Sequence, residues 1–165
     1  MRLSPTSYIV LGLVELGGRA TPYELKRLAA GSVAELWSVP HTQLYTEPAR
    51  LAAAGLLTEE QEPGGRRRKR YALTTAGRRA LDEWRAAPTA ELIELRDPGL
   101  LQLFFGGDPA ALAAEQLGAH ERKLAQYEAH RAELGDAGPA GPRLALEAGI
   151  GHEREYVRFW KRLVW

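Results

Sequence analysis

A run of five cationic residues follows a pair of glycines near the middle of the chain. The glycines are Gly64 and Gly65, and the cations are Arg66, Arg67, Arg68, Lys69 and Arg70. Guanidinium and ammonium groups presented at the end of a loop can contact the phosphates of a nucleic acid. An isolated charge run is otherwise a solvated loop. The elements predicted on either side of the run favour contact with phosphates over a solvated loop.

Three patterns of helical period precede this run. Residues 4–16 begin at Ser4-Pro5 and are apolar nearly all round, which is typical of a central core helix. A second helix opens with a Thr21 capping box and Pro22 and stops near Gly31. A third helix starts within residues 38–41 and ends at Gly55. We therefore expect three helices before the cationic run.

A strand pattern follows the third helix. Residues 56–61 and 68–73 predict two antiparallel strands joined by a turn at residues 63–65. Thr75 is expected to cap one more helix that reaches Trp84. Helix, helix, helix, hairpin, helix is the element order of a winged helix-turn-helix. In that context the cationic run belongs to a wing that touches phosphate.

The second half of the chain predicts two long helices. One starts at Asp108-Pro109 and runs to Leu134, residues 135–142 form a linker, and a last helix carries an apolar seam. Two one-sided helices with a short connection fold back as an antiparallel pair. A further apolar set needs a partner: Leu100, Leu101, Leu103, Phe104 and Phe105. We expect these side chains and the two helices to form a homodimer interface.

Composition narrows the function classes. The chain has no cysteine, which excludes disulfides, thiolate metal sites and cysteine nucleophiles. Up to Arg85 there are thirteen Lys and Arg against nine Asp and Glu, whereas the remainder is mildly acidic. A basic first half suits an anionic partner such as nucleic acid. No apolar run is long enough to span a membrane, so we expect a soluble, cytoplasmic protein without a membrane partner.

Enzyme chemistry is the first alternative, and no motif supports it. The sequence has no nucleophile–base pair, paired-carboxylate motif, glycine-rich cofactor loop or metal-ligand spacing. His152-Glu153 lacks the second histidine of a metalloprotease motif, and no P-loop spacing surrounds Gly65. We predict no catalytic residue, no cofactor and no metal site. A winged helix used only for protein contacts is the second alternative.

Several motifs, in order and at matching spacings, resemble PadR-type transcriptional regulators. They are Pro22-Tyr23-Glu24-Leu25-Lys26, Trp37 to Tyr45, Arg50 to Leu57, Gly65 to Tyr71 and Leu73 to Gly77. After Pro88 the likeness is looser, although Glu94-Leu95-Arg96 is similar to the start of the family's dimerisation domain. The resemblance implies a mostly α fold with a small antiparallel β-hairpin. A winged helix-turn-helix DNA-binding domain would span residues 1–86, and a helical domain for dimerisation and effector binding would span residues 87–165.

The resemblance also implies a mode of action. Members of the family are homodimeric repressors that bind palindromic double-stranded operator DNA and release it on binding a small, often aromatic, molecule. In many members a proline directly follows the tyrosine that corresponds to Tyr45, whereas Thr46 and Glu47 intervene here before Pro48. Pro48 also removes a hydrogen bond inside the helix. We therefore expect a kink, or a recognition helix that effectively begins close to Thr42.

Candidate DNA contacts lie on three elements. Motif position places Ser38, His41, Gln43 and Tyr45 at the start of the recognition helix. Tyr23 and Lys26, near the start of the second helix, can reach the DNA backbone, and Arg66, Arg67, Arg68 and Lys69 are the wing contacts. A glutamine can pair with adenine through both ends of its amide, and a tyrosine hydroxyl often contacts phosphate.

Aromatic side chains gather in the second half. Phe104, Tyr127 and Trp160 are candidate residues for a pocket that binds a small-molecule effector. An aromatic stripe at helical spacing is more often core or dimer interface, and both interpretations stay open. Trp37 and Trp84 lie beside leucines at helical spacing, so we expect both to be core.

Overall fold

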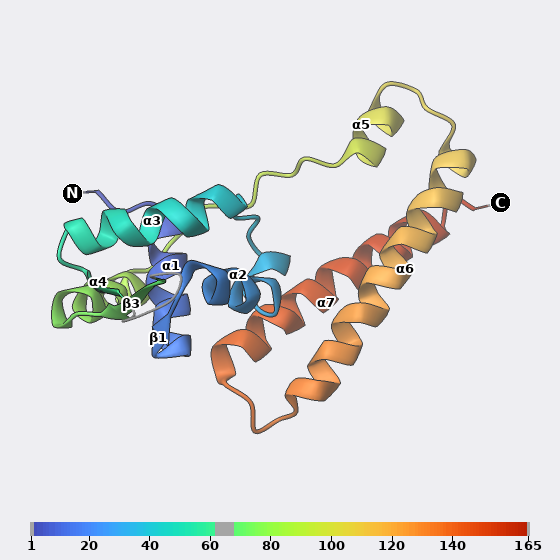
Figure 1. The fold of residues 1–165 in the computed structure, drawn as a ribbon. Helices are drawn as coiled ribbons and strands as arrows, with labels where there is room; N and C mark the ends of the chain where they lie inside the picture. The colour runs from blue at the N-terminus through green and yellow to red at the C-terminus, as the bar shows by residue number, and fades with distance from the viewer. Residues whose placement is uncertain (1, 62–67, 165) are drawn as a thin grey trace. The chain divides into compact units, whose positions relative to one another are not determined.

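The computed structural model describes residues 2–61 and 68–164, apart from the side chain of Glu35. The chain divides into two units, Met1–Glu91 and Leu92–Trp165, and each has its own internal packing. Among the described residues, the first unit contains four α-helices and a small sheet and the second contains three α-helices; Figure 1 draws the chain as a ribbon. Within the described residues, no helix has both the length and the apolar character that crossing a bilayer requires.

Three helices form the framework of the first unit. They are α1 (Pro5–Gly17), α2 (Pro22–Ala30) and α3 (His41–Ala53), with the short 3-10 helix η1 (Val33–Glu35) between the last two. The side chains of Ser4 and Thr21 cap α1 and α2, and a proline follows each cap at the start of the helix. Both predicted starts are confirmed. They could be predicted because each carries two independent start signals, a capping side chain and a proline.

The start of α3 differs from the other two. Its N-cap is Pro40, and no side chain caps the helix. The helix begins at His41, one residue before Thr42, and Pro48 lies inside it. Pro48 is buried on the same side as Leu44, so the proline faces the core of the unit.

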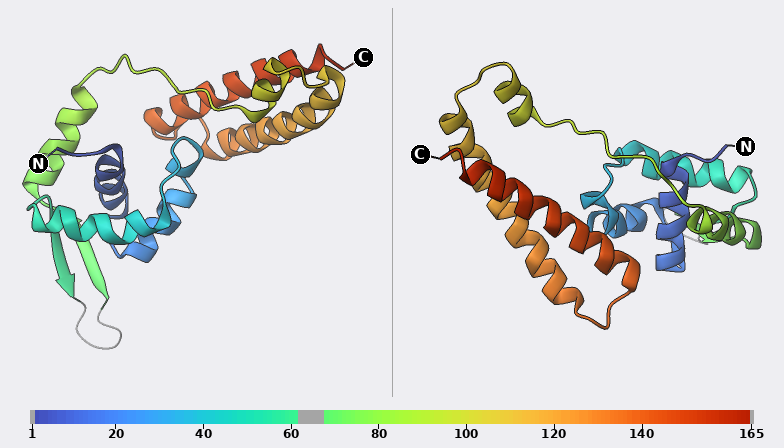
Figure 2. Two further views of the ribbon diagram at one scale, coloured as in Figure 1. Left: turned by 90° about the horizontal axis from the view of Figure 1, so that it is seen from above. Right: turned by 180° about the vertical axis from the view of Figure 1, so that it is seen from behind.

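A sheet of three antiparallel strands completes the winged arrangement. β1 (Arg19–Ala20) pairs with β3 (Lys69–Leu73), and β3 pairs with β2 (Leu57–Gln61), in the order β1-β3-β2. The predicted hairpin is confirmed as β2 and β3, which lie side by side in Figure 2. The third strand was not expected, because two residues are too few to show a strand period.

Aliphatic side chains from every element of the first unit meet in one core. The fully or nearly fully buried members include Val10, Leu11 and Val14 of α1, Leu25 of α2, Leu44 and Leu51 of α3, Leu57 and Tyr71 of the sheet, and Leu81 of α4 (Thr75–Ala86). The burial of α1 on several sides agrees with its nearly uniform apolar sequence. This core fixes the positions of α2, α3 and the hairpin.

The cap of α4 is one residue earlier than predicted. Thr74, not Thr75, is the N-cap, and its hydroxyl accepts a hydrogen bond from the Gly77 amide. A Cβ placed on Gly77 would lie 2.0 Å from the carbonyl oxygen of Leu56, so only glycine fits there. Two adjacent threonines satisfy the capping pattern equally well in the sequence, and the close approach of Gly77 selects the first.

The prediction that Trp37 and Trp84 are core residues is wrong. Their side chains are 50% and 49% exposed. Trp84 lies on the surface of α4 and stacks on Tyr8 of α1, with ring centroids 4.8 Å apart. On α4, Leu81 is buried, whereas Trp84 one turn later is half exposed. Helical spacing beside a leucine therefore did not show whether the tryptophan itself is covered.

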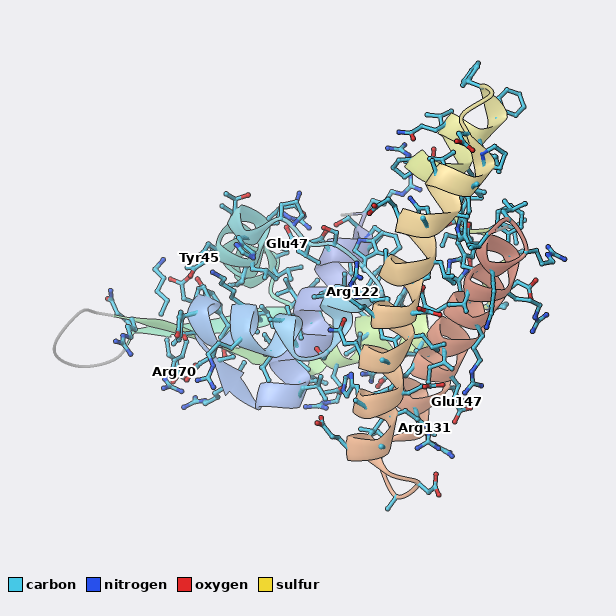
Figure 3. The ribbon with its side chains drawn as sticks, turned by 90° about the vertical axis from the view of Figure 1, so that its right-hand side faces the viewer. Tyr45, Glu47, Arg70, Arg122, Arg131 and Glu147 are labelled. Carbon is cyan, nitrogen blue, oxygen red and sulfur yellow. The ribbon has the colours of Figure 1, made fainter. Side chains whose placement is uncertain are left out.

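The second unit contains a short helix and an antiparallel pair. They are α5 (Pro98–Phe104), α6 (Pro109–Leu134) and α7 (Ala140–Lys161). Asp108 caps α6 at the predicted position, but α7 begins inside the stretch predicted as linker, at Ala140. Arg131 of α6 pairs with Glu147 of α7 at 3.2 Å, and both are labelled in Figure 3. The predicted helical hairpin is confirmed.

Candidate nucleic-acid interface

The recognition helix α3 presents three different faces. Leu44, Pro48 and Leu51 point into the core. At 100° per residue, Thr42 and Thr46 lie on the face opposite to this core stripe, and both are exposed. Gln43 and Tyr45 flank this outward face on its two sides. A side chain on either flank can therefore reach a duplex that lies along the outward face.

One flank of α3 borders a groove that three elements share. The groove is lined by Thr21, Pro22, Tyr23, Glu24 and Arg27 of α2 and its cap, Tyr45 of α3, and Arg68 and Lys69 of the hairpin. Tyr23 is 61% exposed and Tyr45 is 48% exposed. The structure thus brings together four predicted contacts from α2, α3 and the wing, which are far apart in the sequence.

The charges of this groove are partly compensated within the protein. Lys69 forms an ion pair with Glu59 at 2.7 Å, and Arg70 lies 3.7 Å from Glu24. The Thr21 amide donates to Glu24, and with Arg70 and Arg68 nearby it holds the pKa of the Glu24 carboxyl below its ordinary value. Glu24 is therefore ionised within this cationic surface, and the nearby Arg70 and Arg68 balance its charge.

Hydrogen bonding to a carboxylate also affects a group in the core of the hairpin. The Tyr71 hydroxyl donates to Glu59 at 3.0 Å. Burial, together with this bond to an anion, raises the pKa of Tyr71 to about 12. Glu59 thus binds both Lys69 and Tyr71, which fixes the base of the wing on the side that borders the groove.

The other flank of α3 is bound to the first turn of α1. The Thr6 hydroxyl donates to the amide oxygen of Gln43 at 3.0 Å. About two turns further along α3, Arg50 donates to the hydroxyl of the fully buried Ser7 at 3.0 Å and to Glu47. Hydrogen bonds from Arg50 and Ser7 hold the pKa of Glu47 below its ordinary value, although burial acts in the opposite direction. The start of α1 therefore positions the recognition helix.

Not every predicted contact lies in the groove. His41 is exposed in the first turn of α3, Lys26 is half-buried on α2, and Ser38 is exposed before α3 without capping it. Arg66 and Arg67 lie outside the described residues. Figure 3 labels Tyr45 and Glu47 on α3 and Arg70 on the hairpin.

The sequence interpretation missed three polar residues of this surface. Thr42 and Thr46 occupy the outward face of α3, and the spacing of Leu44 and Leu51 alone could have placed them there. Arg27 lines the groove one helical turn after Tyr23. An i, i+4 relation to a predicted contact is the signal that could have found it.

The three predicted effector residues have different environments in the second unit. Phe104 is 82% exposed at the end of α5, where its ring meets Phe105 edge-on. Tyr127 is buried against α7, within 3.1 Å of the point where a Cβ on Gly149 would lie. Trp160 is fully buried, and its indole N–H has no acceptor among the described residues. A pocket formed by these three residues stays a prediction.

The first unit has the element order, the three-stranded sheet and the exposed third helix of a winged helix-turn-helix protein. Residues 10–83 match the family described as transcriptional regulator PadR-like, and residues 95–164 match the one described as virulence activator alpha C-term. Residues 10–83 of the chain thus form a domain of the PadR-like family, which is described for transcriptional regulators. The resemblance predicted from the motifs is thereby confirmed.

Known relatives are similar to this chain over nearly its whole length. The negative transcriptional regulator PadR of Bacillus subtilis is 25% identical and covers 95% of this chain and 94% of its own. The crystal structure of that protein with operator DNA has a TM-score of 0.83 at 22% identity, covering 99% and 98% of the two chains. Its structure with p-coumaric acid has a TM-score of 0.77 at 20% identity, covering 98% and 96%. These similarities show that the two proteins share the whole fold.

Proposed function

We propose that this chain is a dimeric repressor that binds palindromic operator DNA through Met1–Glu91 and releases it on binding a small aromatic or otherwise apolar ligand. The observation that carries the DNA-binding part is the shared groove, where Tyr23, Tyr45 and Arg68 from three elements line one surface. Two phenol hydroxyls and a guanidinium on one surface match the donors that proteins use to hold a phosphate backbone. The Bacillus subtilis relative crystallised with operator DNA supports the same assignment.

A duplex fits this surface for geometric reasons. A recognition helix enters the major groove along its outward face, so Thr42 and Thr46 would meet base edges. Tyr45 on one flank and Arg68 at the base of the wing would then meet the adjacent sugar–phosphate backbone. Two such units related by a two-fold axis would read two half-sites of a palindrome, about one helical turn apart.

The test begins with selection of bound duplexes from a random pool, followed by titration of the selected duplex with salt. A protein that neutralises phosphates loses affinity with a log–log slope of about −0.9 per phosphate. Arg68→Ala should make the slope shallower by about one such unit. Arg79→Ala is the matched control, since Arg79 is an exposed arginine of α4 that lies outside the groove.

Two results would contradict the DNA assignment. One is a pool from which no duplex is enriched, and the other is binding that does not change with salt. Either result would favour the use of this winged helix for protein contacts. An equal change of slope in Arg68→Ala and Arg79→Ala would show that the groove has no special part in phosphate binding.

Dimerisation through the second unit is supported by exposed apolar side chains. Leu101, Phe104 and Phe105 of α5 and the residue after it are 60%, 82% and 78% exposed. Leu92 and Ile93, at the start of the same unit, are 94% and 84% exposed. Clustered apolar exposure of this kind marks an interaction surface, and a second copy of the chain would cover it.

Effector binding is supported by the buried Trp160 indole. A buried N–H without an acceptor costs free energy, and a ligand oxygen placed beside it would remove that cost. Release of the selected duplex should be measured with p-coumaric acid as the first probe, because the Bacillus subtilis relative was crystallised with it. Trp160→Phe keeps an aromatic ring, although a smaller one, and removes the N–H, so it should weaken the release. Release that is equal in both proteins would remove Trp160 from the site.

A further inference from the structure

Gln43 and Thr6 bind each other across two helices. Gln43 lies in the first turn of α3, on the flank that faces α1, and its side chain is exposed. Thr6 lies in the first turn of α1, and its hydroxyl donates to Oε1 of Gln43 at 3.0 Å. The two residues are far apart in the sequence, so the fold alone creates this bond.

The two helices that carry this pair are held rigidly at the same place. Ser7, next to Thr6, is fully buried, and its hydroxyl accepts from the Arg50 guanidinium at 3.0 Å and from the Ser4 amide at 2.9 Å. Arg50 in turn binds Glu47, which is one turn from Gln43 on α3. The bond between Thr6 and Gln43 therefore joins two fixed backbones, and it restrains the Gln43 side chain with little further loss of entropy.

This restraint changes what Gln43 can recognise. Pairing with adenine needs the amide oxygen and the amide nitrogen of a glutamine to face the same base edge. In this chain Oε1 already accepts from Thr6, so a base contacting both ends would have to share Oε1 with the Thr6 hydroxyl. The Nε2 group is directed away from Thr6, and it carries two hydrogen-bond donors and no acceptor.

We propose that Thr6 is a positioning residue that makes Gln43 a hydrogen-bond donor to DNA. The base it would select presents acceptors and no donor to this amide, either O6 and N7 of guanine or O4 of thymine, in preference to adenine, which offers N7 alone as an acceptor beside its N6 donor. The inference rests on the proposed DNA binding. It concerns which base one residue of the recognition helix prefers.

The experiment compares the base preference of four variants on duplexes selected from a random pool. Thr6→Val removes the hydroxyl and keeps the shape, whereas Thr6→Ser keeps the hydroxyl. Gln43→Ala identifies the base position that Gln43 contacts, because preference at that position alone should relax. The double variant with Thr6→Val and Gln43→Ala then shows whether Thr6 acts through Gln43.

The expected result is guanine or thymine at the Gln43 position for the unmodified chain and for Thr6→Ser. Thr6→Val should gain affinity for adenine at that position by about fivefold or more relative to guanine. In the Gln43→Ala background, Thr6→Val should have no further effect on base preference. A loss of affinity on all duplexes alike would be a structural effect, and it would leave the base ratio unchanged.

Three results would overturn the inference while leaving the DNA assignment intact. They are a preference of the unmodified chain for adenine at the Gln43 position, a base ratio that is the same with and without the Thr6 hydroxyl, and no change of preference on Gln43→Ala. Failure of the unmodified chain to enrich any duplex is a different outcome. It would contradict the proposed function itself and the inference together with it.

Discussion

The two units of the molecule bury their apolar side chains to different extents. In Met1–Glu91, side chains from four helices and the sheet form one closed core, with Leu11, Leu25 and Leu51 fully buried. In Leu92–Trp165 the described buried apolar side chains are fewer, and Phe104 and Phe105 are largely exposed. The first unit can thus hold a surface in place by itself, whereas the second leaves apolar side chains exposed, which another apolar surface could cover.

Within the described part of the chain, buried polar groups occur in both units, such as Ser7 in the first and Glu153 in the second, but the charged one lies in the second. The ion pairs of the first unit lie at its surface, as for Arg19 with Glu60. In the second unit Glu153 is 8% exposed and contacts Nδ1 of His120 at 2.6 Å. Burial and the neighbouring Asp97 carboxylate raise the pKa of Tyr156, whose ring lies against that of His120. The second unit thus encloses one carboxylate beside a histidine, while Phe104 and Phe105 are left largely exposed.

The largest expected effect concerns the exposed phenylalanines. Phe104→Glu combined with Phe105→Glu should raise the dissociation constant of the proposed dimer about a thousandfold. The dimer interface would lose two rings that it covers and would gain two charges. Sedimentation equilibrium measures this directly. Leu16→Glu is the control, since Leu16 is a 71% exposed leucine of the first unit. An unchanged dimer in the double variant, or equal dissociation in the control, would show that α5 is not the interface.

A core truncation in the first unit should be the next largest effect. Leu51→Ala removes a fully buried side chain and should lower the free energy of unfolding by about 3 kcal/mol. Because the first unit has its own core, this loss should not depend on protein concentration. Urea denaturation at two protein concentrations provides the measurement. Leu16→Ala should change the free energy by less than about 0.5 kcal/mol. A concentration-dependent loss on Leu51→Ala would mean that dimer contacts, not its own core, stabilise the first unit.

Start signals made most helices predictable from the sequence. α1, α2 and α6 each begin with a capping side chain followed by proline, and their N-termini were correct. Where the signals are weaker, the predictions failed in specific ways. β1 has only two residues, α7 starts without a capping side chain, and two adjacent threonines precede α4. For β1 and α4 the deciding interactions come from residues distant in the sequence, namely β3 and Leu56.

The candidate site was also predictable in part, because motif position and charge can be read from the sequence alone. Tyr23, Tyr45, Arg68 and Lys69 were named from motif position and charge, and the structure brings them together. The partners of these residues could not be named, because they depend on the packing of separate elements. The ion pair between Lys69 and Glu59 and the bond between Thr6 and Gln43 both join segments that only the fold makes neighbours.

Tyr71 provides a pH test of the first unit alone. Its pKa is raised from about 10 to about 12, so the unfolded chain ionises at a lower pH than the folded one. The stabilisation is complete below about pH 10 and is lost as the pH rises toward 12. At about pH 11 the loss should be roughly 1.4 kcal/mol. The free energy of unfolding at about pH 8 and pH 11 should therefore fall more for the unmodified chain than for Tyr71→Phe. Equal falls in the two proteins would contradict this assignment.

The smallest expected effect concerns the surface charges that join α1 to α4. Glu15 accepts hydrogen bonds from Arg85 and Arg78, and the Arg85 bond above all holds the pKa of Glu15 below its ordinary value. This carboxylate contributes stability above its ordinary pKa, and the contribution is lost as the pH falls through the lowered value. Because both arginines are about half exposed, Glu15→Gln should cost only about 0.5 kcal/mol near pH 7.

Two conditions and one control variant distinguish this effect from the burial differences between the units. The cost of Glu15→Gln should shrink in high salt and disappear in acid, where Glu15 of the unmodified chain is itself neutral. Glu83→Gln is the matched control, because Glu83 pairs with Arg79 within α4 and both side chains are largely exposed. A cost of Glu15→Gln above about 2 kcal/mol, or one that persists in acid, would mean that the first unit depends on this pair as well as on its apolar core.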